Sequence, residues 1–176
     1  METNIERAEM TSAEAAKMLR KLSDEHEALL AREENSREFL ASVGEDPESV
    51  RPEYDFSAVQ TELAGIEDEI RALKHALNVF NTITVVPEFG MTVDQMLVFI
   101  PQLTKRKAKL NEMRSRLKKM RAEPKYGRQQ TFIDYSYANY DIEEADDDYI
   151  AAETLLSQAQ LALDRVNSTE TFEVTL

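Results

Sequence analysis

The chain has 176 residues, a formal net charge of −13, and neither Cys nor Trp. The lack of Cys excludes disulfides, thiolate metal sites and thiol catalysis, and no apolar run reaches the 18 residues that a membrane span needs. Because the first residues also lack the apolar core of a signal peptide, we expect a cytoplasmic protein with no membrane partner. The acidic total disfavours direct nucleic-acid binding.

A first helix is predicted over residues 12–43. Thr11 and Glu14 form a capping box, and Gly44 is a plausible C-terminal stop. The predicted apolar row is interrupted by three polar residues, and its members are Leu19, Leu22, His26, Leu29, Glu33, Ser36, Leu40 and Val43. We interpret Glu33 and Ser36 as a layer that faces water or a polar partner. Residues 44–56 hold two prolines and several acids, which predicts a loop.

A second helix is predicted over residues 58–81, after a capping box that begins at Ser57. Its apolar residues alternate spacings of four and three, which is a 3.5-residue repeat held for about three heptads. These seam residues are Val59, Leu63, Ile66, Ile70, Leu73, Leu77 and Phe80. Other helices must cover this seam, either from the same chain or from another copy. The β-branched residues 82–86, which precede Pro87, predict a short strand.

A third helix is predicted over residues 93–122, with a kink or break at Pro101. Between Lys105 and Arg128 there are eleven Lys and Arg residues and only two acids, a local charge of +9. One interpretation is a basic helix neutralised by acidic neighbours; the other is a cationic surface for an anionic ligand.

Alternating residues predict a strand over 131–139. Tyrosines gather here beside cations, and rings together with guanidinium groups can stack a planar group and bind phosphate. The candidate ligand-binding residues are Arg121, Lys125, Arg128, Tyr135 and Tyr137. The same residue types suit an oligomer interface or internal packing, so three interpretations stay open.

A fourth helix is predicted over residues 142–167, followed by a possible strand over 171–175. Its row is Ile142, Ala145, Tyr149, Ala152, Leu156, Ala159, Leu163 and Val166, and the small Ala residues allow a close partner. The acids near its start favour the helix dipole and lack the spacing of a calcium loop. With only His26 and His75 in the chain, we expect no metal site, no catalytic residue and no cofactor.

Several short stretches resemble a family of small bacterial helical proteins called septicolysin-like, which is largely of unknown function. The stretch Leu77–Asn81 resembles its Ile-Asn-x-Thr-Asn sequence, although Phe80 replaces the threonine. The remaining matches are Thr84, Gly90–Thr92, Leu103, Arg128 and Leu163–Asn167. An Arg-Asp pair of the family appears here as Ile100–Pro101. The resemblance implies a helical, coiled-coil fold and no defined activity.

Together these patterns predict a single all-α domain over residues 1–176. Its long antiparallel helices would form a helical hairpin or four-helix bundle, coiled-coil-like, with a minor β element. The function expected first is a non-enzymatic homo-oligomeric scaffold or protein-interaction protein. One alternative is an oligomeric binding protein for an anionic small molecule such as a nucleotide. Another is an acidic decoy that blocks a nucleic-acid-binding protein by capturing its basic surface.

Overall fold

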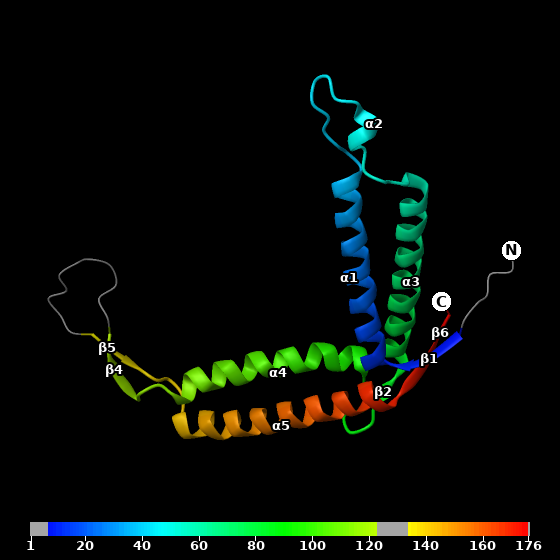
Figure 1. The fold of residues 1–176 in the computed structure, drawn as a ribbon. Helices are drawn as coiled ribbons and strands as arrows, with labels where there is room; N and C mark the ends of the chain where they lie inside the picture. The colour runs from blue at the N-terminus through cyan, green and yellow to red at the C-terminus, as the bar shows by residue number, and fades with distance from the viewer. Residues whose placement is uncertain (1–6, 123–133, 176) are drawn as a thin grey trace. The chain divides into compact units, whose positions relative to one another are not determined.

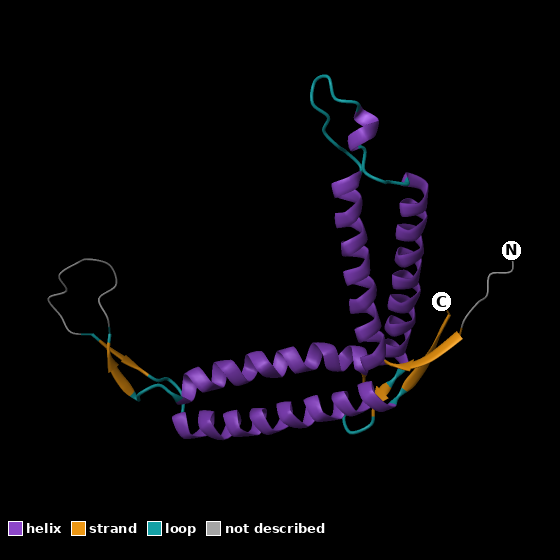
Figure 2. Ribbon diagram, viewed as in Figure 1, coloured by secondary structure: helices purple, strands orange, loops and turns teal. Residues whose placement is uncertain are grey.

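The computed structural model describes residues 7–122 and 134–175 and is predominantly helical, as the sequence predicts (Figures 1 and 2). Its contacts group into two units, which we describe separately: one combines the chain up to Thr84 with the residues from Arg165 onward, and the other runs from Val85 to Asp164. The elements in chain order are β1 (Arg7–Thr11), α1 (Ser12–Ser36), α2 (Pro47–Val50), α3 (Phe56–Ile83), β2 (Val85–Val86), β3 (Met91–Thr92), α4 (Val93–Arg114), β4 (Lys119–Arg121), β5 (Tyr135–Tyr137), α5 (Ile142–Thr169) and β6 (Thr171–Thr175).

The first unit is built on α1 and α3, which lie side by side (Figure 1). The Thr11–Glu14 capping box begins α1, as the sequence predicts. All seven seam residues of α3 are buried or half-buried, and Leu73 is fully buried against Leu22 and their neighbours. Because α1 and the strands cover this row, the seam forms an internal core.

Strands β1 and β6 pair in antiparallel register, with Met10 opposite Phe172 and Ala8 opposite Val174. These four side chains share one face of the ribbon and join the core of the first unit, where Phe172 meets Phe80 at 5.0 Å between ring centroids. The β1 strand is not predicted from the sequence, whereas β6 confirms the strand expected over 171–175. The chain therefore closes its core with residues from both of its ends.

In the second unit α4 and α5 run side by side (Figure 1), and the apolar row predicted for α5 is buried or half-buried throughout its length. Four of its buried residues are alanines, Ala145, Ala152, Ala159 and Ala162. The α4 helix contributes Met96, Leu103 and Leu110. It continues through Pro101 without a break, so the expected break is wrong. The short β2–β3 ribbon packs at the start of α4, where Val86 and Val93 are buried.

The first helix ends at Ser36, so its predicted extension to residue 43 is wrong. Leu40 is 95% exposed and Val43 is fully exposed, because α3 begins at Phe56 and offers no surface beyond that point. Glu33, near the last turn of α1, already contacts Tyr54 in the approach to α3. An apolar row that packs against no partner gains no burial energy, so nothing offsets the conformational entropy that a longer helix would lose. The predicted loop contains the short α2, and Asp55 rather than Ser57 caps α3.

Two other boundaries also differ from expectation. The α4 helix ends at Arg114 rather than 122, because Lys119–Arg121 pair with Tyr135–Tyr137 as strands. Helix α3 runs to Ile83, so the strand expected from residue 82 is limited to Val85–Val86. Of the strand predicted over 131–139, residues 131–133 lie outside the described part and β5 covers Tyr135–Tyr137.

We expect the same substitution to be costly in the core at Leu73 and nearly neutral at Leu40, beyond the end of α1. Leu73→Ala removes a side chain with no exposure and leaves a cavity, so it should lower the free energy of unfolding by about 2–5 kcal/mol. Leu40→Ala should change it by no more than about 0.5 kcal/mol, because that side chain is solvated. Urea unfolding followed by circular dichroism measures both. An equal loss for the two variants would contradict this core.

Candidate functional site

Basic residues of α4 meet acidic residues of α5 in three ion pairs within the second unit. Lys107 Nζ lies 2.6 Å from Glu153, Arg114 Nη1 lies 2.9 Å from Asp146, and Arg106 lies 3.8 Å from Asp148. These contacts favour the interpretation of a basic helix neutralised by acidic neighbours for this part of the chain. Asp146 and Asp148, two of the acids near the start of α5, therefore have structural partners.

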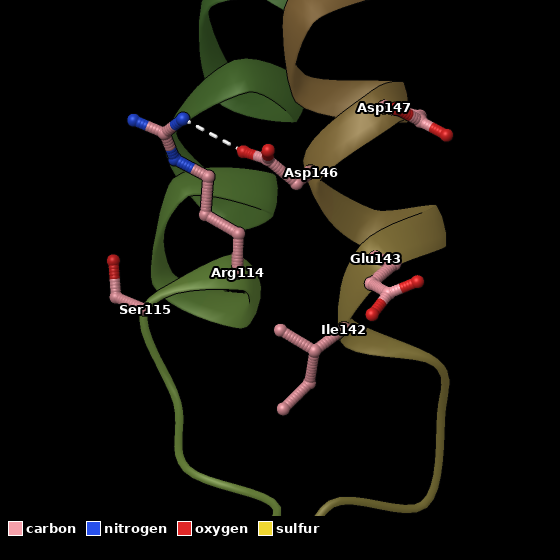
Figure 3. A pocket seen from close by; sticks show the side chains of 6 residues that line it. All are labelled: Arg114, Ser115, Ile142, Glu143, Asp146 and Asp147. Atoms are coloured by element: carbon pink, nitrogen blue, oxygen red, sulfur yellow. Dashed lines mark hydrogen bonds and ion pairs between the residues drawn. The ribbon is translucent and has the colours of Figure 1, made fainter.

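Arg114, like Lys107, is a half-buried cation, whereas Arg106 is exposed. The Arg114 guanidinium group lies 3.6 Å from the centre of the Tyr149 ring, and its Nε donates to Asn111. An open hollow surrounds it at the start of α5, where Asp146 points toward the guanidinium group while Asp147 points away (Figure 3). Because Nε, Nη1 and the flat face of the guanidinium group already have partners, we interpret Arg114 as a structural link between α4 and α5.

Tyr149 also connects Lys107 with Glu153. The Tyr149 hydroxyl donates to Glu153, and Lys107 lies over the ring at 5.6 Å. The hydrogen bond from Lys107, followed by that from Tyr149, lowers the pKa of Glu153. The hydrogen bond to Glu153 in turn raises the pKa of Lys107. Both shifts keep the pair charged, which is the behaviour of a structural ion pair rather than of an acid–base catalyst.

The histidines and acids do not assemble a metal site in the described part of the chain. His26 lies 3.2 Å from Glu67 across α1 and α3, and the Tyr54 hydroxyl donates to Glu33 at 3.2 Å. His26 and Glu33, two of the three polar members of the α1 row, thus have polar neighbours. Asp141 accepts from the backbone N–H of Glu143 and so helps to begin α5.

The β4–β5 ribbon presents a basic and aromatic surface. Lys119 pairs with Tyr137 and Arg121 pairs with Tyr135, so all four side chains lie on one face of the antiparallel ribbon. Lys119 Nζ lies 4.1 Å from the centre of the Tyr135 ring and 5.5 Å from that of Tyr137. All four residues are exposed. We call this set, Lys119, Arg121, Tyr135 and Tyr137, the tyrosine–cation face.

Three of the five predicted ligand residues therefore come together, namely Arg121, Tyr135 and Tyr137. Lys125 and Arg128 lie outside the described residues. Sequence reasoning missed Lys119, because this residue was placed inside a helix that was expected to reach 122. Strand alternation from Arg121 would have found it, since residues two apart share a face.

A shallow groove borders the last turns of α3 and β6 in the first unit. Its lining is part apolar and part polar. The apolar side includes Ala76, Val79, Ile83 and Phe172, and the polar side chains are His75, Thr84, Thr171, Glu173 and Thr175.

Comparison with known proteins gives a fold and no activity. No family model and no curated protein matches the chain. A solved structure described as a functionally unknown conserved protein from Corynebacterium diphtheriae is similar, with a TM-score of 0.61 and 20% identity over 94% of this chain and 99% of that chain. At that identity the likeness extends to the fold alone. The septicolysin-like resemblance stays a prediction. Among the described residues, no helix is both long and apolar enough to cross a bilayer.

The Lys107–Glu153 pair should stabilise the fold over a defined pH window. Glu153 has a lowered pKa, so its contribution is present above the ordinary value of 4.5 and is lost as the pH falls through the lower, folded value. Lys107 has a raised pKa, so its contribution persists up to the ordinary value of 10.5 and is lost at higher pH. Glu153→Gln should therefore lower the Tm at pH 7 and by less at pH 3.

The matched control is Glu69→Gln, which neutralises an exposed acid in the interior of α3. Melting curves from pH 3 to pH 8 measure both variants. A Tm difference for Glu153→Gln that is constant over this range, or one shared by the control, would contradict the assignment.

Proposed function

We propose that the chain is a non-enzymatic, homo-oligomeric helical scaffold that works through protein contacts in the cytoplasm. In this proposal α1 with α3 and α4 with α5 are antiparallel, coiled-coil-like hairpins. The order of the cross-helix pairs supports this arrangement: His26 meets Glu67 while Glu33 meets Tyr54, and Lys107 meets Glu153 while Arg114 meets Asp146. In each case the residue number rises along one segment and falls along the other.

One observation supports the interaction role above the others, namely the exposed tyrosine–cation face. Lys119 and Arg121 form no ion pair with an acid in the described residues, in contrast to Lys107 and Arg114. Tyr and Arg are enriched at protein interfaces, because they supply large contact areas together with hydrogen-bond donors. A face with two unneutralised cations favours an acidic partner.

The same face is the basis for a second candidate function, the binding of a small anion such as a nucleotide. Lys119 stacked on two tyrosine rings could hold a phosphate while a ring stacks on a base. The exposure of all four side chains favours a macromolecular partner, because small-ligand sites bury most of their ligand in a concave pocket. The acidic decoy has less support, since Asp146, Asp148 and Glu153 already pair with α4.

The scaffold proposal predicts concentration-dependent association of the full chain. Sedimentation velocity should give a mass above the 20.1 kDa of one copy at micromolar concentration. Lys119→Ala with Arg121→Ala should weaken that association by about tenfold, which is about 1.4 kcal/mol. Lys105→Ala with Lys109→Ala removes two exposed charges from α4 and serves as the matched control. A single copy at every concentration would exclude the homo-oligomer.

The nucleotide alternative has its own test. If the tyrosine–cation face binds ATP, calorimetric titration of the wild-type chain should show a heat of binding. That heat should disappear in the Lys119→Ala, Arg121→Ala variant. Inorganic phosphate serves as the comparison, because it carries charge without a ring to stack. No heat with ATP would exclude this alternative while leaving the scaffold proposal standing.

A further inference from the structure

The segment that joins α1 to α3 exposes its apolar side chains. We call residues 37–56 the tip segment. None of its residues is buried, with Leu40 95% and Phe56 65% exposed. Local contacts nevertheless define its shape: Asp46 caps α2, Arg51 pairs with Glu48 at 2.7 Å, and the Arg51 guanidinium group lies over Phe39. Exposed apolar surface that is concentrated in one segment is typical of an interaction surface, and the segment exposes Phe39, Leu40, Val43, Val50 and Phe56.

The tip segment is also acidic. It contains six acids and two arginines, a formal charge of −4. Both arginines are engaged within or next to the segment, Arg37 with Glu33 and Glu34 and Arg51 with Glu48. The free charge that remains is therefore negative. Two tip segments placed face to face would repel each other, so this surface requires a cationic and apolar counterpart.

The chain itself carries a surface of that kind on the β4–β5 ribbon. The tyrosine–cation face supplies two cations and two exposed rings, and Leu117, Lys118 and Met120 are exposed beside it. The charges are opposite to those of the tip segment, and both surfaces expose apolar groups that could pack on one another. Electrostatic complementarity of this kind selects partners and orients them.

We propose that the tip segment of one copy docks on the tyrosine–cation face of a second copy. This inference rests on the proposed homo-oligomeric function and names the two surfaces that meet. Since the surfaces differ, the contact is heterologous, and repeating it produces either a closed ring or an open chain of copies. Leu40, Val43 and Phe56 would lie against Tyr135 and Tyr137, with the tip acids facing Lys119 and Arg121.

Charge reversal tests the pairing directly. One variant carries Glu38→Lys and Glu53→Lys in the tip segment, and the other carries Lys119→Glu and Arg121→Glu on the ribbon. The tip variant brings the formal charge of the tip segment from −4 to 0 and so removes the attraction, whereas the ribbon variant makes both surfaces negative. The self-association of each variant alone should therefore fall at least tenfold in sedimentation velocity at low salt. An equimolar mixture lets the unchanged tip segment of the ribbon variant meet the unchanged tyrosine–cation face of the tip variant, so it should restore association through that junction.

Matched reversals elsewhere control for net charge. Glu62→Lys with Glu69→Lys on α3 and Lys17→Glu with Arg20→Glu on α1 change exposed residues outside both surfaces, and they should leave association unchanged. Far-UV circular dichroism verifies that every variant is folded. Leu40→Ser with Val43→Ser should also weaken association without loss of helicity, because it removes apolar contact without altering charge.

The tip-to-ribbon contact and the homo-oligomeric function would be overturned by different results. Association that survives both charge reversals would overturn the tip-to-ribbon contact while leaving a homo-oligomer formed by another surface. Loss in each variant without recovery in the mixture would also overturn it. A wild-type chain that is a single copy at all concentrations would overturn the inference and the oligomeric function together.

Discussion

The burial of the α3 row is the constraint on which the first unit depends. Seven apolar residues at a 3.5-residue spacing form a continuous stripe, and the area of such a stripe is worth far more than any surface ion pair in this chain. The chain covers it with α1 and with a ribbon made from its first and last strands. This solution explains why strands from opposite ends of the sequence pair, since Met10 and Phe172 are needed over Leu73 and Phe80.

The second unit also buries an apolar row, but with smaller side chains, and ion pairs flank the contact between its helices. The buried alanines of α5 allow a close approach, so each residue removes little apolar area. The ion pairs of Lys107 and Arg114 flank this contact and are partly exposed, where such pairs contribute little stability. These ion pairs instead select the register of the two helices, because a shift of α5 along α4 would separate each cation from its acid. The segregation of positive charge in α4 and negative charge in α5 thus has a local structural role.

The sequence predicts burial better than it predicts boundaries. Periodicity identifies Leu73 and Ala159 as core, because a residue on an apolar row is buried wherever the row has a partner. It cannot say where the partner ends, which is why Leu40 and Val43 were expected inside a helix and are exposed. Strand β1 was missed because its pairing with β6 joins segments more than 150 residues apart, and no local signal reports such a contact. Lys119 was missed for a related reason, since its face follows from pairing with Tyr137.

The charge that remains after pairing within the chain is what a partner meets. A net charge of −13 describes the molecule only at long range, and at an ionic strength of 0.1 M charges more than about 10 Å apart are screened. At contact distance the sign changes from place to place: Lys119 and Arg121 face solvent without an acid in the described residues, whereas the tip segment retains an excess of carboxylates. Copies that repel each other as whole molecules can therefore attract each other through particular surfaces. Such an association would strengthen as salt screens the long-range repulsion, then weaken at higher salt as the local attraction is screened in turn. Apolar contact through Leu40 and Phe56 would persist at high salt, so the shape of the salt dependence would report how much each kind of contact contributes.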